Sequence, residues 1–170
     1  IYLLFSLAFS ESIAQVACGD VQVFLSTDFD KPPFYSISCS VTKGECFGER
    51  VWENGVKYLG HFKDGKLHGK GKITFQENGS YYEGQFENGI PHGYGKIIHE
   101  DNSKYEGDWK HGKKEGQGAY LFPCGDEYLG EFQQDQINGE GIILLTNGTS
   151  YVGILKDGLA HGEGTLSYQD

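Results

Sequence analysis

The chain has 170 residues, of which 38% are hydrophobic and 14% aromatic, and its formal net charge at pH 7 is −10. This length and composition fit one folded region without a second large domain. The negative balance disfavours nucleic acid and anionic membrane surfaces, because both recruit clustered Lys and Arg. We therefore expect no nucleic-acid partner and regard membrane association as disfavoured.

The chain begins with an apolar run, residues 1–9, which is followed by the small residues Ser12 and Ala14. This pattern is typical of a secretion signal, and the run is too short to span a membrane. We predict a signal peptide over residues 1–14 and export to a periplasmic or extracellular space. Two alternatives keep the protein at a membrane: an uncleaved N-terminal anchor, or a lipoprotein signal that ends at Cys18.

The next segment, residues 15–45, is interpreted as an N-terminal β cap. Residues 21–25 and 35–41 alternate as strands do, and a proline-containing loop joins them. The cap would cover the open edge of the first hairpin. Cys18, Cys39 and Cys46 are candidates for a disulfide, but four cysteines allow three pairings and the sequence does not choose between them. Cys124 is expected to present an exposed thiol at a hairpin tip.

A sequence unit recurs after this segment. The pattern Tyr-x-Gly-x-Phe-x-x-Gly-x-x-His-Gly-x-Gly-x-Ile starts at five tyrosines spaced by 24 residues once and 23 residues three times, namely Tyr58, Tyr82, Tyr105, Tyr128 and Tyr151. Self-similarity at a short fixed period indicates a repeat architecture. Residues 46–57 look like the closing half of another unit. We predict a repeat domain over residues 46–170, made of a half repeat and five repeats.

Each unit is predicted to be one β-hairpin. Tyr58, Gly60 and Phe62 alternate on one face of a strand, Asp64 and Gly65 supply a tight turn, and residues 69–75 resume the alternation. The glycine should leave a gap for a ring from the neighbouring hairpin. A lone hairpin cannot bury its apolar face, so successive hairpins must stack. The predicted fold is all-β: an elongated, single-layer, twisted antiparallel sheet of stacked hairpins with an N-terminal β cap.

The repeated residues resemble the MORN family (membrane occupation and recognition nexus), and the chain looks like a secreted, bacterial-type member. The resemblance covers about residues 46–170, and its clearest copies begin at Tyr58 and Tyr82. Later copies depart from the pattern, with Glu115 in the histidine slot, Asp135 in place of a turn glycine and Leu155 in the aromatic slot. These departures weaken the expectation of an unbroken side-chain ladder. The family name implies lipid-headgroup binding as one role.

Catalytic and metal-binding patterns are missing from the sequence. His68, His92 and His161 share a register position, but units ~9.5 Å apart place these ligands too far from one another to share a zinc ion. There is no Cys-x-x-Cys, no Gly-x-Ser-x-Gly and no phosphate-cradling loop that ends in Lys-Ser or Lys-Thr. We therefore predict no enzyme activity, no metal and no cofactor.

The leading functional hypothesis is a non-catalytic exported scaffold that binds a protein or peptide partner through an aromatic face and a glycine-floored groove. The alternative for the aromatic residues is that they form the core. Binding of phosphoinositide or phospholipid headgroups, or of an envelope glycan by aromatic stacking, is the alternative function. The terminal strand, residues 164–168, predicts a homodimer by edge pairing. The candidate binding residues are Tyr82, Phe86, Tyr105, Trp109, Tyr128 and Phe132.

Overall fold

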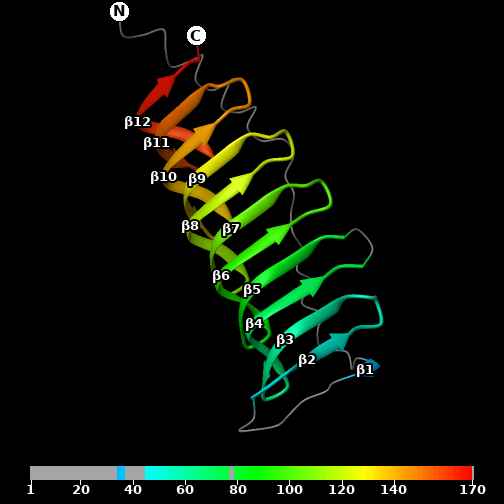
Figure 1. The fold of residues 1–170 in the computed structure, drawn as a ribbon. Helices are drawn as coiled ribbons and strands as arrows, with labels where there is room; N and C mark the ends of the chain where they lie inside the picture. The colour runs from blue at the N-terminus through cyan, green and yellow to red at the C-terminus, as the bar shows by residue number, and fades with distance from the viewer. Residues whose placement is uncertain (1–33, 37–44, 77–78, 170) are drawn as a thin grey trace, which may run out of the picture.

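A computed structural model describes residues 34–36, 45–76 and 79–169. They form one antiparallel sheet of twelve strands in sequence order (Figure 1), which confirms the all-β prediction. The strands are β1 (Phe34–Ser36), β2 (Glu45–Val51), β3 (Lys57–Lys63), β4 (Lys66–Thr74), β5 (Tyr81–Glu87), β6 (Ile90–Ile98), β7 (Lys104–Lys110), β8 (Lys113–Leu121), β9 (Glu127–Gln133), β10 (Gln136–Leu144), β11 (Ser150–Lys156) and β12 (Leu159–Ser167).

The predicted signal peptide lies outside the described residues, and so does most of the predicted N-terminal cap. Of the cap, the structure describes the short strand β1, which pairs with β2, and the start of β2 itself. The predicted half repeat corresponds to β2, which pairs with β3 along its whole length.

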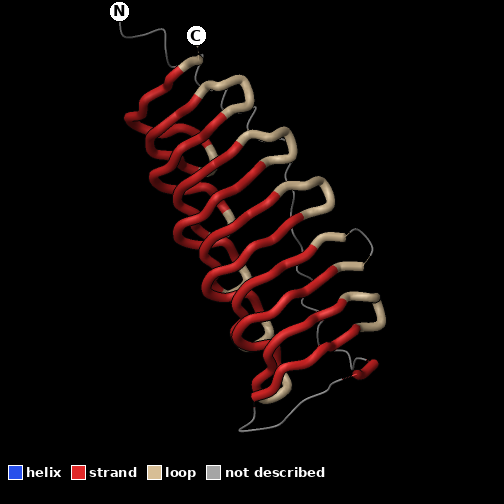
Figure 2. The backbone as a smooth tube through the Cα atoms, in the orientation of Figure 1, coloured by secondary structure: helices blue, strands red, loops and turns tan. Residues whose placement is uncertain are grey.

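The sheet is a long ladder with one row of turns along each side (Figure 2). One row holds the turns within each hairpin, which have two residues at positive φ, as a type I′ hairpin turn requires. The predicted Asp-Gly turn is of this kind, with φ of 49° at Asp64 and 75° at Gly65. The fourth repeat uses Gln134 and Asp135 at φ of 52° and 73°, so Asp135 adopts the conformation that glycine adopts in the other repeats.

A β-bulge on each returning strand was not predicted. The strand begins at Lys66 rather than at residue 69, and Gly60 pairs with Gly71 while Phe62 pairs with Leu67. One residue of β3 therefore faces three residues of β4, and the middle one, Gly69, has a φ of 63°. A bulge bends its strand, and Figure 2 shows the strands curving toward the short turns. The bulge explains the glycine that follows each histidine slot.

The repeat glycines make room for the tyrosine of their own hairpin. A Cβ atom at Gly60 or Gly71 would overlap the Tyr58 ring, which lies across this glycine pair. The expectation that a ring from the neighbouring hairpin fills the gap is therefore wrong. The physical reason is the register, because Gly60 and Gly71 face each other across one hairpin and neither has a Cβ atom that would overlap the Tyr58 ring.

Each tyrosine hydroxyl is also hydrogen-bonded. The Tyr58 hydroxyl donates to the main-chain oxygen of His61, 2.7 Å away. His61 is the residue that the bulge leaves without a register partner on β4. The same bond recurs in the other four repeats at 2.7 to 3.1 Å. The tyrosine thus fills the glycine space and satisfies a polar group that the bulge would otherwise expose.

The core is a ladder of edge-to-face aromatic contacts along the sheet. Rings from successive repeats alternate with centroid separations of 4.9 to 5.3 Å, a geometry that aromatic pairs prefer. Leu155 continues the core in the fifth repeat and is 1% exposed. In the first four repeats the ladder is unbroken, and it runs in the order Phe62, Tyr58, Phe86, Tyr82, Trp109, Tyr105, Phe132 and Tyr128.

Candidate interaction surface

The six aromatic residues proposed for partner binding belong to this core. Their side chains are between 0% and 4% exposed. Each ring packs edge to face against a ring of its own repeat, and all except Tyr128 also pack against a ring of an adjacent repeat, so a partner could touch them only if the sheet opened. The expectation that these residues form an exposed binding surface is therefore wrong, and the alternative, that they are core, agrees with the structure.

Two cysteines fall within the described residues. Cys46 is disulfide-bonded, whereas the other two disulfide candidates, Cys18 and Cys39, lie outside the described residues. Cys124 is exposed in the turn between β8 and β9, and its thiol lies 3.4 Å from the Asp126 carboxylate.

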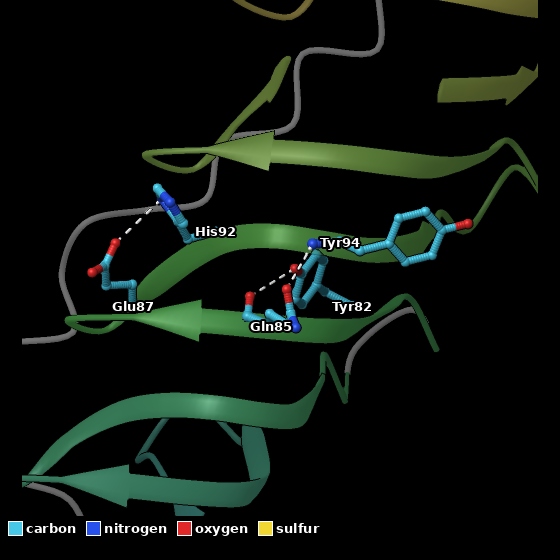
Figure 3. A network of polar contacts seen from close by, with 5 residues as sticks. All are labelled: Tyr82, Gln85, Glu87, His92 and Tyr94. Carbon is cyan, nitrogen blue, oxygen red and sulfur yellow. Dashed lines mark hydrogen bonds and ion pairs between the residues drawn. The ribbon is translucent and has the colours of Figure 1, made fainter. Parts of the chain in front are cut away.

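The histidines do not converge on a site. His92 Nδ1 lies at ion-pair distance, 3.5 Å, from the Glu87 carboxylate (Figure 3), and its ring centroid is 5.4 Å from that of His111. Within the described residues, no group of three or more His, Cys, Asp or Glu side chains is arranged to hold a metal ion.

In the described part of the chain, no helix is long and apolar enough to cross a membrane.

The opposite side of the sheet, which we call the open face, carries the residues that alternate with the core. Figure 3 shows the polar contacts that one hairpin makes on the two faces of the sheet. On the core side, the Tyr82 hydroxyl donates to the Gln85 main-chain oxygen. On the open side, the Gln85 side-chain oxygen accepts a 3.0 Å bond from the Tyr94 main-chain nitrogen at the bulge. The Tyr94 side chain is 55% exposed.

The open face has a central row, formed by the residue after each repeat tyrosine and its partners on neighbouring strands. The row changes character along the molecule. From β4 to β7 it alternates Lys72, Glu83, Lys96 and Glu106, and the Lys72 nitrogen is 3.5 Å from the Glu83 carboxylate. From β8 to β11 it consists of apolar residues in direct register, namely Ala119, Leu129, Ile142 and Val152.

These apolar residues are accessible to solvent. Leu129 is 41% exposed, Ile142 38% and Val152 49%, and Ile154 beside them is 43% exposed. Scattered apolar residues are common on protein surfaces, but a contiguous row is typical of a binding site.

Acidic residues border the apolar row. Asp108, Glu131 and Glu140 lie on the same face, one position nearer the bulges, and Glu163 follows on β12. Glu131 is held 3.5 Å from the Gln117 side-chain nitrogen. The C-terminal half of the open face is therefore apolar in its centre and acidic along one side.

A shallow groove of about 850 Å³ follows this region from Tyr94 on β6 to Glu163 on β12. Its lining includes four glutamates and no lysine, arginine or histidine. The predicted glycine-floored groove is thus present, although the aromatic core lies beneath it rather than in it. The glycines among its lining residues are Gly107, Gly118, Gly130, Gly141 and Gly153.

Lys114 is an exception within the core. It occupies the slot that Leu67 and Ile137 fill in other repeats, and it is 9% exposed. Its ammonium nitrogen lies 4.6 Å from the Tyr120 ring centroid and 5.4 Å from that of Tyr105. Burial lowers the pKa of Lys114, and the Asp135 carboxylate partly offsets this. This lysine does not line the groove.

The stacked hairpins and the open groove define a β-repeat scaffold. The sequence profile of the MORN repeat matches residues 58–80, 82–104, 105–127, 128–150 and 151–170. The chain therefore belongs to the MORN-repeat family, whose members are generally non-catalytic interaction modules.

No curated protein matches the sequence significantly. Among solved structures, the chain is similar to the SAS-4 (dCPAP) TCP domain of Drosophila melanogaster, in complex with a proline-rich motif of Ana2 (dSTIL). The two are 13% identical, the match covers 80% of this chain and 89% of that chain, and the TM-score is 0.38.

Proposed function

We propose that the protein is a non-catalytic scaffold that binds a protein partner in the groove of its open face. The observation that carries this proposal is the contiguous exposed row of Leu129, Ile142 and Val152 that lines an elongated groove. A long, shallow surface suits an extended or helical segment better than a small molecule, because a small ligand is normally enclosed by its pocket.

The test is affinity capture from a native extract with the full chain and two matched variants. Leu129→Ser removes an apolar side chain from the groove, whereas Leu59→Ser removes one that is 52% exposed, also follows a repeat tyrosine, and lies outside the groove. The proposal expects a partner that the wild type and Leu59→Ser retain and that Leu129→Ser loses. A partner held equally by all three proteins would contradict it.

Lipid-headgroup binding is the second candidate, and the family name is what favours it. The groove opposes it, because its glutamates repel anionic headgroups. Flotation with vesicles of anionic phospholipid tests this role, and we expect no salt-sensitive association. For glycan binding by stacking, the structure offers one exposed groove aromatic, Tyr94, among the described residues.

Export and dimerisation remain proposals. The disulfide of Cys46 supports an oxidising compartment, since such bonds persist mainly outside the cytosol. N-terminal sequencing of the native protein would test cleavage after Ala14. Strand β12 is bonded to β11 alone among the described strands, so edge pairing predicts a dimer, and light scattering that shows only monomer at high concentration would exclude it.

A further inference from the structure

The central row contains two different surfaces on one face of one sheet. In β4–β7 its lysines and glutamates alternate and neutralise one another, as in the Lys72–Glu83 pair. In β8–β11 the same row is apolar, and the acids beside it have no such neighbours. Among the described residues, no lysine or arginine forms an ion pair with Glu131, Glu140 or Glu163. The groove that holds the exposed apolar row thus carries three carboxylates that form no ion pair among the described residues.

This combination identifies the partner by its chemistry. Burying the apolar row requires an apolar surface on the partner, while the glutamates that lack an ion-pair partner favour positive charges at the edge of that surface. Glu106 is less available, because Lys104 lies 2.8 Å from its carboxylate and the Tyr94 hydroxyl 3.2 Å from it. The remaining carboxylates therefore lie toward the C-terminal end of the groove.

The spacing of the row favours a helix over an extended strand. Neighbouring strands of a sheet are ~4.8 Å apart, so the apolar row offers one contact position at every such step. A helix that crosses the strands presents one side chain per turn of ~5.4 Å, close to this spacing. An extended peptide in the same direction presents same-face side chains every ~6.7 Å, and this spacing does not match the spacing of the apolar row. The span from β6 to β12 is ~29 Å and matches a helix of about 20 residues.

We propose that the groove receives a positively charged amphipathic helix, with its apolar side on Leu129, Ile142 and Val152 and its lysines or arginines facing Glu131, Glu140 and Glu163. The proposal rests on the proposed function, and it adds the partner's secondary structure, its charge and its position on the C-terminal half of the array.

The test uses three synthetic peptides of about 20 residues. The first has leucine along one side of a helix and lysine elsewhere, the second replaces every lysine with glutamate, and the third is a scrambled lysine peptide. Fluorescence anisotropy with the full chain should show binding of the first peptide and affinity at least about tenfold weaker for the other two. Raising the salt from about 0.05 M to about 0.5 M should weaken the binding.

Charge-reversal variants locate the site. Glu140→Lys with Glu163→Lys should lower the affinity for the lysine peptide at least about tenfold, whereas Glu83→Lys, on the same face but outside the groove, should leave it unchanged. All three substitutions fall on exposed side chains, and circular dichroism verifies that the variants fold. Equal binding of the acidic peptide, or indifference to the groove reversal, would overturn the inference.

Other occupants give distinct results. Self-association of the wild type that Ile142→Ser abolishes would identify a second copy of the chain and overturn the inference. Binding to anionic vesicles that the same variant abolishes would also overturn it. If the peptides fail while affinity capture still yields a partner that Leu129→Ser loses, the proposed function holds and the helix inference fails. If both experiments fail, the proposed function fails as well.

Discussion

The indole nitrogen of Trp109 donates a hydrogen bond of 3.0 Å to the main-chain oxygen of Gly95, and this bond joins the third repeat to the second. In the other aromatic repeats the slot holds phenylalanine, which has no donor. The Trp109 ring also meets the Tyr82 and Tyr105 rings edge to face. One residue therefore contributes both packing and a polar bond to the contact between two repeats.

Trp109→Phe should separate these contributions. The smaller ring keeps aromatic packing but leaves the Gly95 oxygen without its side-chain donor, and we expect a loss of about 1–3 kcal/mol in the free energy of unfolding. Trp109→Leu should cost more, because it also removes the edge-to-face contacts. Urea denaturation measures both. A Trp109→Phe protein as stable as the wild type would show that the hydrogen bond contributes nothing.

The glycine pairs predict a second effect on stability. A Cβ atom at Gly84 would meet the Gly95 Cα atom at 2.5 Å and the Tyr94 main-chain oxygen at 2.8 Å, neither of which can move freely. Gly84→Ala should therefore destabilise the protein by about 1–3 kcal/mol through overpacking.

Gly89→Asn is the control for that substitution. This turn residue has a φ of 94°, and nothing lies within 4 Å of the position that a Cβ atom would take there. Asparagine also tolerates the left-handed conformation, so a small change is expected. Equal losses in the two variants would mean that backbone conformation, rather than the tyrosine space, determines the glycine requirement.

Lys114 predicts a substitution that stabilises the protein. Its slot holds an apolar residue in every other repeat, and burial lowers the pKa of Lys114. The charged form is therefore disfavoured in the fold at neutral pH, where an unfolded lysine is protonated. Lys114→Leu should raise the free energy of unfolding by about 1–3 kcal/mol. Lys113→Leu, at an exposed neighbouring position, should change the free energy of unfolding little. A urea midpoint for Lys114→Leu below that of the wild type would show that the contacts of Lys114 with the aromatic rings outweigh the cost of removing its charge from water.

The buried tyrosines predict loss of stability in alkali. Burial raises the pKa of Tyr58, Tyr82 and Tyr105 above the ordinary 10.0, and it raises the pKa of Tyr128 to about 12. Above pH 10 the unfolded chain loses these protons while the folded chain keeps them. The contribution of the buried tyrosines to the free energy of unfolding is therefore fully present below pH 10 and falls as the pH rises further. Each fully buried phenol contributes up to about 1.4 kcal/mol per pH unit.

Urea denaturation at pH 9 and at pH 11 measures this slope. Tyrosinate absorbance of the core tyrosines should appear together with unfolding. Ionisation of all tyrosines before unfolding would contradict the burial of the ladder.

Much of the fold was predictable because the same sequence pattern occurs in five copies. The spacing of Tyr58, Gly60 and Phe62, with the Asp64 turn, identifies the hairpin, and five copies imply stacking. The bulge at Gly69 was missed because a glycine after a polar residue is equally consistent with a turn or a strand start. Only the register shows that its function is to bend the strand.

The six aromatic core residues were assigned to an exposed surface for a related reason. Aromatic residues are enriched in both cores and interfaces. Their identity alone therefore does not tell which face of the sheet is buried. The positions that alternate with them carried the missing signal: Glu83 and Glu106 give way to Leu129 and Val152 one residue after successive tyrosines. This change is apparent in the sequence, but its meaning depends on the even strands, which place Ala119 and Ile142 in the same row.

Hydroxyl-radical footprinting of the full chain with and without the lysine peptide tests the central claim most directly, because it reports on both faces at once. In the free protein, Tyr94 and Ile142 should react while Tyr82 and Tyr105 stay protected. Added peptide should protect Ile142 and Leu129 and leave Leu59 unchanged. Rapid modification of Tyr82 and Tyr105 in the free protein, with protection there on binding, would show that the aromatic ladder is the recognition surface and that the groove is not.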